Sequence, residues 1–303
     1  MIRLDDLKIS YRIGSRVIDA VDGVTLTIPD GCIVGIAGES GCGKSTLMKA
    51  IYGDIQSPMS LSGGSIQYSM KGADGRPVTT ENIRREWFKT ISYIPQSSMN
   101  SLNPVVRIRD QFTDFPGTDS NKKRVLEKAR AYIGKLGLPP EAMESYPHQL
   151  SGGMRQRVMI ALATFFQPEL IIADEPTTAL DVVVQKEILM LLMEVQEMMG
   201  NTILVVSHDM GVHYQVTHKM LIMYAGRVVE YGDTESVFAD PQHAYTRMLI
   251  DSLPTIGDDS MRGVLASLAG AGGDRAFRVE PELIEIKPGH FVARPSESVG
   301  AAA

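Results

Sequence analysis

The first part of the chain alternates apolar and polar positions in segments rich in β-branched side chains. LKISYRI and VTLTI are two such segments, and turn residues such as Gly14 and Gly23 interrupt the pattern around them. A period of two with glycine at the breaks is typical of strands joined by turns. We therefore expect an antiparallel β subdomain between Leu4 and Ile28.

Continuous apolar runs mark a second kind of strand. They cover residues 32–37, 170–173 and 202–206. Such runs are expected of strands that are buried on both faces, as in a parallel sheet. Helical patterning, for example QKEILMLLMEVQEMM at 185–199, separates them. This alternation of strand and helix predicts an α/β fold with a central sheet.

Two stretches depart from this alternation. Residues 97–157 are polar and loop-rich at first and then helical, with no strong strand, which predicts an inserted helical subdomain. Beyond Tyr245 the chain contains Leu-Pro, Ala-Gly-Ala-Gly-Gly and a terminal SVGAAA. Compositions of that kind favour flexible chain, so we expect order to decline at 255–275 and again at the end.

Charge and cysteine content narrow the class of protein. The net charge is −6, with 30 basic and 36 acidic residues, so no broad positive potential is expected and nucleic acid is not a predicted partner. Only Cys32 and Cys42 are present, which predicts a reducing compartment and no structural disulfide. No apolar run reaches the ~18–20 residues that cross a bilayer, and no signal-peptide pattern is evident. If the protein works at a membrane, another chain must provide the span.

A glycine-rich loop follows the first buried run and precedes a predicted helix. It fits the pattern G-x-x-x-x-G-K-[ST], which cradles phosphates with backbone N–H groups at a helix N-terminus. In this position Lys44 would contact the β- and γ-phosphates and the hydroxyl of Ser45 would bind Mg²⁺. The predicted nucleotide-binding loop comprises Gly38, Glu39, Ser40, Gly41, Cys42, Gly43, Lys44, Ser45 and Thr46.

Two carboxylates end the buried run LIIADE. Ligands meet open α/β sheets at the carboxyl ends of strands, so Asp174 suits the Mg²⁺ shell and Glu175 suits a general base that polarises the attacking water. Alone, such a pair of carboxylates is more typical of a helix cap or a solvated turn. Because the chain also has a phosphate loop, the interpretation as a Mg²⁺ ligand and a general base is favoured.

A second anion site is predicted at Ser151, Gly152 and Gly153, which begin the helical segment MRQRVMIALATFF. Free N–H groups and a hydroxyl at a helix start suit a phosphate, although an ordinary capped helix has the same residues. One nucleotide does not need two cradles from one chain. We therefore expect a dimer in which each ATP lies between the phosphate loop of one subunit and the Ser-Gly-Gly of the other.

With these motifs in this order, the chain resembles an ABC-type nucleotide-binding domain over residues 4–240. LSGGMRQR resembles the signature motif of that family and IIADEP its Walker B motif. The resemblance implies a Q-loop at Gln96, a D-loop at Ala179-Leu180-Asp181, a switch histidine at His208 and an adenine-stacking aromatic at Tyr11. It implies catalytic roles for Lys44, Gln96, Glu175 and His208, a Mg²⁺ site at Ser45, Gln96 and Asp174, and a nucleotide contact from Asp181.

Further segments resemble the oligopeptide, dipeptide and nickel importer branch. They include SMNSLNP at 98–104, ADEPTTALDVVVQ at 173–185, HAYTRMLIDSLP at 243–254 and PELIEIKPGHFVA at 281–293. Ala244 stands where that branch commonly has proline. Many members carry a cysteine cluster proposed to hold an iron–sulfur centre, but this chain has no cysteine after Cys42, so none is predicted.

The resemblance implies a phosphate-loop ABC-type ATPase in residues 1–240, with the helical subdomain at about 97–157, and a C-terminal extension in 241–303. The expected fold is a mixed central sheet with the antiparallel and helical subdomains added.

The implied function is the ATP-binding and ATP-hydrolysing subunit of an importer of peptides, nickel or oligosaccharides, with ATP and Mg²⁺ as cofactors. Expected partners are two membrane permease subunits, a second and preferably different ATPase subunit, and an extracytoplasmic solute-binding protein. The expected location is peripheral, on the cytoplasmic face of the cell membrane. The residues do not choose among the solutes, and a homodimer stays open.

Two other classes of protein remain as alternatives. A soluble ABC ATPase of an enzyme or nucleic-acid complex often has two cassettes, a coiled-coil insertion or a basic face, none of which is evident. A phosphoryl-transferring kinase on a phosphate-loop fold would lack the Ser-Gly-Gly at 151–153.

Overall fold

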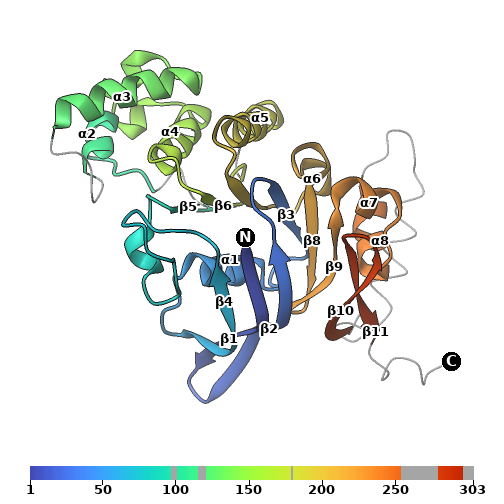
Figure 1. Cartoon of the computed structure of the whole chain (residues 1–303). Coiled ribbons are helices and arrows are strands. Elements are labelled where there is room, and N and C mark those ends of the chain that lie inside the picture. Colours follow the sequence, from blue (N-terminus) through green and yellow to red (C-terminus); the bar gives the residue numbers. More distant parts are fainter. Residues whose placement is uncertain (97–100, 115–120, 179, 254–278, 296–303) are drawn as a thin grey trace. The chain divides into compact units, whose positions relative to one another are not determined.

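The computed structural model describes residues 1–96, 101–114, 121–178, 180–253 and 279–295 (Figure 1). It divides into two compact units, one formed by residues 1–69 with 206–303 and the other by residues 70–205. The expected decline of order at 255–275 lies outside the described residues. The predicted domain boundary between residues 240 and 241 stays a prediction.

The first unit contains a three-stranded antiparallel sheet, in the order β2-β1-β4. Its strands are β1 (Ile2–Ile13), β2 (Arg16–Ile28) and β4 (Met59–Tyr68). This confirms the antiparallel N-terminal subdomain, to which β4 adds a strand that the apolar pattern did not predict. Leu4, Leu7 and Ile9 face the core, and register shifts around them accommodate the irregular spacing of these apolar positions.

The first unit also contains five strands of mixed direction, in the order β10-β11-β9-β8-β3. β3 (Ile33–Ala37) is buried throughout and pairs in parallel with β8 (Lys219–Tyr224). β9 (Arg227–Asp233), β11 (His290–Pro295) and β10 (Val279–Lys287) extend the sheet in antiparallel fashion. The helices of this unit are α1 (Lys44–Tyr52), α6 (Met210–Val216), α7 (Thr234–Ala239) and α8 (Ala244–Asp251).

The second unit has its strands in the order β7-β6-β5. β5 (Ile91–Ile94) and β6 (Leu170–Asp174) pair in parallel. Every residue of β6 and of β7 (Thr202–Val206) is buried, as expected of apolar strands that are covered on both faces. α5 (Val182–Met199) connects these two strands.

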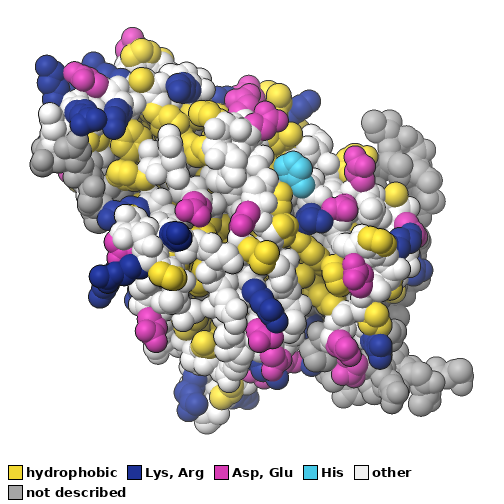
Figure 2. Space-filling model, in the orientation of Figure 1, with side chains coloured by type: hydrophobic (Ala, Val, Ile, Leu, Met, Phe, Trp, Pro, Cys, Tyr) yellow, Lys and Arg dark blue, Asp and Glu magenta, His cyan; other side chains and the backbone are white. Residues whose placement is uncertain are grey.

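Between β5 and β6 the described residues form helices, which confirms the inserted helical subdomain. They are α2 (Ile108–Thr113), α3 (Lys122–Lys135), α4 (Gly152–Thr164) and the short helices η3 (Pro140–Glu144) and η4 (Pro147–Gln149); η1 (Ile83–Glu86) precedes β5. The ring of Phe112 packs edge-on against that of Phe165, with centroids 5.1 Å apart. Lys and Arg side chains gather over α2 and α3 among a few acidic ones (Figure 2).

No helix among the described residues is both long enough and apolar enough to cross a bilayer.

Candidate functional site

The predicted phosphate loop joins β3 to α1 and can be built only from glycine at two positions. A Cβ added to Gly38, which has a φ of 147°, would lie 2.2 Å from the carbonyl oxygen of Met223. A Cβ added to Gly43, with a φ of 107°, would lie 2.2 Å from the carbonyl oxygen of Ala20. Both neighbours are backbone atoms that cannot move aside, so the loop requires glycine there. Gly43 is also the N-cap of α1 and, having no side chain, gives no side-chain cap hydrogen bond.

Lys44 folds back over this loop. Its Nζ donates hydrogen bonds of 2.7 Å to the carbonyl oxygens of Gly38 and Glu39, and the residue is buried. The N–H groups at the start of α1 and the ammonium therefore lie on one short segment. Together they supply the donors and the positive charge that a phosphate group requires.

Tyr11 lies on β1 in the same unit as the loop. Its hydroxyl oxygen is 3.2 Å from Oγ1 of Thr46, the last residue of the loop. Across the sheet Tyr11 pairs with Ile18 of β2, whose side chain is exposed. Directly paired residues face the same side of a sheet, so a half-buried aromatic ring and an exposed aliphatic side chain lie together beside the loop.

Asp174 ends β6 with its carboxylate held by a neighbouring strand. The hydroxyl of Tyr93 on β5 donates a 2.7 Å hydrogen bond to Oδ2 of Asp174, which is buried. The parallel pairing of β5 with β6 places Tyr93 opposite Ile172 and so within reach of that carboxylate. Tyr93 was not among the predicted site residues, because a tyrosine in a strand carries no motif.

Glu175 follows immediately and takes an unusual backbone conformation. Its φ is 48°, in the left-handed region that residues other than glycine rarely adopt. Oε2 of Glu175 accepts hydrogen bonds from Nε2 of Gln96 at 2.7 Å and from the hydroxyl of Thr178 at 2.9 Å. The structure thus brings together Gln96 and Glu175, which the sequence separates widely, and adds Thr178 to the predicted set.

The Ser-Gly-Gly segment and the predicted D-loop line one hollow of about 320 Å³ in the second unit. Ser151 is the N-cap of α4, and its hydroxyl accepts a 3.2 Å hydrogen bond from the N–H of Met154. Asp181 caps α5 in the same way, and its carboxylate accepts from the N–H of Val184 at 3.0 Å. A Cβ on Gly153 would lie 2.8 Å from Val184, so the helices approach closely only with glycine there. Ala179 lies outside the described residues.

His208 is exposed and precedes α6, in the same unit as the phosphate loop. The neighbouring Asp209 caps α6, since its Oδ1 accepts from the N–H groups of Gly211 and Val212 at 2.8 and 3.2 Å. A second histidine, His213, is fully buried on α6, with Nε2 3.1 Å from the carbonyl oxygen of Ser207. Burial lowers the pKa of His213 to about 4.

This buried histidine predicts a loss of stability in mild acid. His213 is neutral when folded but takes up a proton below its ordinary pKa of 6.5 when unfolded, so the stability present above pH 6.5 declines as the pH falls towards 4. Between pH 7 and pH 5 the loss is about 2 kcal/mol, at about 1.4 kcal/mol per pH unit. Urea unfolding should show this loss in the unmodified chain and a smaller one in His213→Gln, whose amide can still donate to Ser207. The same substitution at exposed His148 is the control, and an equal pH dependence in all three proteins would contradict the prediction.

The two sets of predicted residues belong to different units. The phosphate loop, Tyr11 and His208 lie in the first unit, and Gln96, Asp174, Glu175, Asp181 and Ser151–Gly153 lie in the second. The role of each residue toward a nucleotide or Mg²⁺ stays a prediction.

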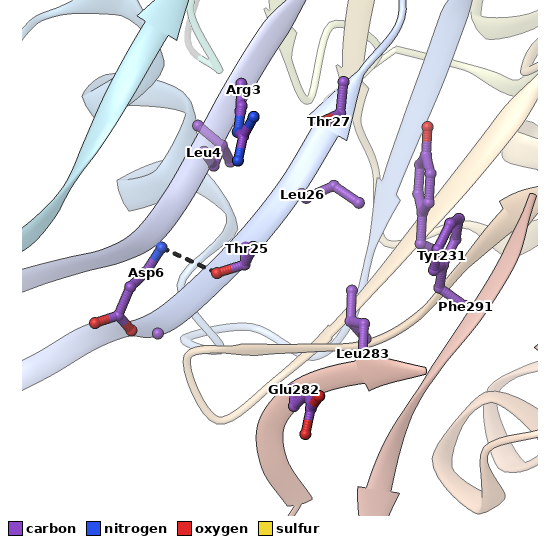
Figure 3. Close-up of a pocket in the computed structure, with 11 residues that line it drawn as sticks. Arg3, Leu4, Asp6, Thr25, Leu26, Thr27, Tyr231, Glu282, Leu283 and Phe291 are labelled. Atoms are coloured by element: carbon purple, nitrogen blue, oxygen red, sulfur yellow. Dashed lines mark hydrogen bonds between the residues drawn. The ribbon is translucent and has the colours of Figure 1, made fainter. Parts of the chain in front are cut away.

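A separate hollow of about 490 Å³ lies in the first unit, between the N-terminal strands and the C-terminal hairpin (Figure 3). Leu26, Leu283, Tyr231 and Phe291 give it an apolar lining, with Arg3, Asp6 and Glu282 among its polar residues. None of its lining residues belongs to the predicted nucleotide set. This hollow is therefore not the candidate site.

Comparison with known families gives two matches along the chain. Residues 21–178 match the ABC transporter family, and residues 229–275 match the C-terminal region of the oligopeptide/dipeptide transporter family. The first match covers the phosphate loop, the Ser-Gly-Gly and both carboxylates. The second begins on β9 and includes α8.

Curated relatives match most of the chain. The dipeptide transport ATP-binding protein DppD of Caldanaerobacter subterraneus subsp. tengcongensis is 38% identical, over 86% of this chain and 80% of that protein. The oligopeptide transport ATP-binding protein AmiE of Streptococcus pneumoniae is 38% identical, over 88% and 75%. DppD of Escherichia coli is 37% identical, over 89% and 83%.

Solved structures give the same fold. The ATP-binding cassette MJ0796, seen as a dimer in a post-hydrolysis state with ADP and Pi, has a TM-score of 0.64 and 27% identity, covering 77% of this chain and 99% of that one. CbiO1 of Clostridium perfringens, part of the ABC transporter complex cbiONQ, has a TM-score of 0.64 and 25% identity, covering 79% and 90%.

Proposed function

The chain belongs to the ABC transporter family, and from that membership we propose which of its residues bind and hydrolyse ATP and which proteins it works with. It is an ATP-binding and ATP-hydrolysing subunit of an importer of the oligopeptide and dipeptide class. The residue assignments rest on the joint occurrence of three features in one chain. These are a phosphate loop that requires glycine, two carboxylates at the end of a strand, and a Ser-Gly-Gly at the start of a helix.

ATP binds at the phosphate loop in this proposal. Lys44 exchanges its carbonyl partners on Gly38 and Glu39 for phosphate oxygens, and the N–H groups at the start of α1 contribute further donors. Adenine stacks on the ring of Tyr11, beside the exposed Ile18. The contact between Tyr11 and Thr46 joins this aromatic side chain to the end of the loop.

The hydroxyl of Ser45, the carboxylate of Asp174 and the amide oxygen of Gln96 are the side chains proposed to hold Mg²⁺. They are hard oxygen donors, which suit this ion. When bound, the ion neutralises charge on the phosphates. Tyr93 orients the Asp174 carboxylate through its 2.7 Å hydrogen bond. We assign no iron–sulfur cluster, because the sequence has no cysteine after Cys42.

Glu175 is the proposed general base. Its left-handed backbone conformation and two hydrogen bonds, from Gln96 and Thr178, hold the carboxylate in one orientation. A carboxylate oriented in this way can accept the proton of an attacking water. His208, exposed ahead of α6, is the proposed contact to the γ-phosphate.

The proposed dimer places the Ser-Gly-Gly of each subunit over the nucleotide of the other. Two features of the second unit support it. Ser151, Gly152, Gly153 and Asp181 line one open hollow. Beside Asp181, Val182 and Val183 are 79% and 69% exposed, and exposed apolar side chains next to a polar site are typical of an interface. The similar cassette MJ0796 has been solved as a dimer, which supports dimerisation.

The remaining proposed partners are two permease subunits, a second ATPase subunit and an extracytoplasmic solute-binding protein. The proposed location of the chain is the cytoplasmic face of the membrane.

The segment around 97–115 would receive a helix of the permease, and Val105 within it is 79% exposed. We propose a different ATPase as the second subunit because SGGM, ADEPTTALDV and MYAGR resemble the D-type subunit of this branch. The relatives' names favour a transporter over a soluble complex.

Ser151→Arg tests the shared site. The chain is co-expressed with candidate companion ATPases and two permease subunits, and ATP hydrolysis is measured on the purified complex. The arginine fills the hollow and blocks the site whose phosphate loop belongs to the partner, so a heterodimer keeps the site built on Lys44 of this chain. In a homodimer both sites are lost.

Asn121→Arg is the matched control, because Asn121 caps α3 as Ser151 caps α4 but lies outside the hollow. Full hydrolysis in the Ser151→Arg complex would refute the shared site. A chain that fails to purify with any permease would count against the transport partners.

A further inference from the structure

Tyr245 connects the C-terminal extension to the phosphate loop. It lies on α8, inside the segment that matches the oligopeptide/dipeptide transporter C-terminal region. Its hydroxyl oxygen accepts a 2.8 Å hydrogen bond from the backbone N–H of Glu39, which lies 206 positions earlier in the chain. Glu39 is the second residue of the phosphate loop. The side chain of Tyr245 thus links the extension to the candidate nucleotide site.

The ring of Tyr245 is packed among buried apolar side chains. It is fully buried in an apolar cluster that includes Ala37, the residue that precedes the loop, and Met220 and Ile222 of β8. The ring of Tyr224 contacts it, with centroids 4.7 Å apart. Burial raises the pKa of Tyr245, so the hydroxyl stays protonated and neutral.

Glu230 anchors the start of α8. Its buried carboxylate accepts hydrogen bonds of 2.9 Å from the N–H groups of Gln242 and His243. Nε2 of His290, on the hairpin strand β11, lies 2.7 Å from the same carboxylate. The position of Tyr245 is therefore set by β9 and by the hairpin, both of which lie beside α8 in Figure 1.

The backbone of Glu39 is consequently held at both polar atoms. Its N–H donates to Tyr245, and its carbonyl oxygen accepts from Nζ of Lys44. The loop around it contains Gly38, Gly41 and Gly43, and glycine has more conformational freedom than any other residue. Without an anchor such a loop would sample more conformations, and only the binding-competent fraction contributes to affinity.

We propose that Tyr245 is a positioning residue for ATP binding. This residue of the C-terminal extension holds the start of the phosphate loop in the conformation that binds nucleotide. This inference rests on the proposed role of the loop in binding ATP. Tyr245 acts through Glu39 and does not itself contact the nucleotide. Its effect therefore falls on the affinity for ATP and not on the hydrolytic step.

The test is Tyr245→Phe in the full chain, assembled in its transporter complex. The ring and its packing are kept, and only the hydroxyl is lost. We expect the KM for ATP to rise about 3- to 10-fold, the effect of losing one hydrogen bond, with kcat at saturating ATP unchanged. Tyr132→Phe is the control, since its hydroxyl donates a 2.6 Å hydrogen bond to Thr164 in the helical subdomain. The control should leave the KM for ATP unchanged.

Hydrogen exchange gives a second readout that does not depend on activity. In the absence of nucleotide, backbone amides of the loop should exchange faster in Tyr245→Phe than in the unmodified chain or in Tyr132→Phe. An unchanged KM with unchanged exchange would overturn the proposal. So would a lower kcat at unchanged KM, which indicates a smaller folded fraction. Failure of the unmodified chain to bind ATP would instead refute the proposed function.

Discussion

Glu175→Gln slows ATP hydrolysis by about 10²- to 10⁴-fold, the usual cost of removing a positioned general base. The amide is nearly the same size as the carboxylate and can still accept from Gln96 or Thr178, but it cannot take up a proton from water. Lys44, the loop glycines and Asp174 are untouched, so ATP still binds. Without hydrolysis to separate the subunits, ATP-loaded dimers should accumulate.

The measurement is phosphate release at saturating ATP, together with ATP affinity and the dimer fraction. Glu169→Gln is the matched control, because Glu169 is exposed and lies just before β6, at the opposite end of the strand from Glu175. The control should hydrolyse ATP at the unmodified rate. Normal turnover in Glu175→Gln would remove Glu175 from the mechanism and leave Gln96 and Thr178 bound to a structural carboxylate.

Lys44→Ala weakens ATP binding itself by about 10- to 100-fold. The ammonium is the buried positive charge of the loop, and a hydrogen bond to a charged group contributes about 1.5–3 kcal/mol, with about 1.4 kcal/mol for each factor of ten. The substitution also frees the carbonyl oxygens of Gly38 and Glu39, which Lys44 now engages. Hydrolysis falls as well, because the same charge stabilises the transferring phosphate.

Titration of the chain with ATP checks this result, and Lys49→Ala is its control. Lys49 is exposed on the same helix α1, one turn from its end, so its removal changes the net charge by the same amount without touching the loop. An ATP affinity that is unchanged in Lys44→Ala, or equally reduced in Lys49→Ala, would contradict a direct contact between Lys44 and phosphate.

The parts of the fold that depend on local sequence pattern could be predicted from the sequence. Continuous apolar runs placed β3, β6 and β7 closely, because strands buried on both faces leave no polar position within them. The alternation of apolar and polar positions predicted β1 and β2. β4 was missed because its sequence, MSLSGGSIQY, contains two glycines and few apolar residues, and it is held as a strand by pairing with β1.

The candidate site was predictable where a motif requires particular residues and not where a side chain acts through long-range pairing. Gly38 and Gly43 were expected from the loop pattern, and backbone crowding explains them. Tyr93 and Tyr245 were not expected. Each reaches a predicted residue only because the fold brings together segments that are 81 and 206 positions apart in the sequence. No local pattern encodes such contacts.

If ATP hydrolysis by this chain drives import, transport must stop when hydrolysis stops. The test is uptake of a labelled dipeptide, together with phosphate release, in vesicles that contain this chain, its companion ATPase, two permease subunits and the solute-binding protein. We expect both signals in the unmodified complex and a parallel loss of both in Glu175→Gln. Uptake that continues at the unmodified rate in Glu175→Gln, or without ATP, would show that hydrolysis by this chain does not drive import.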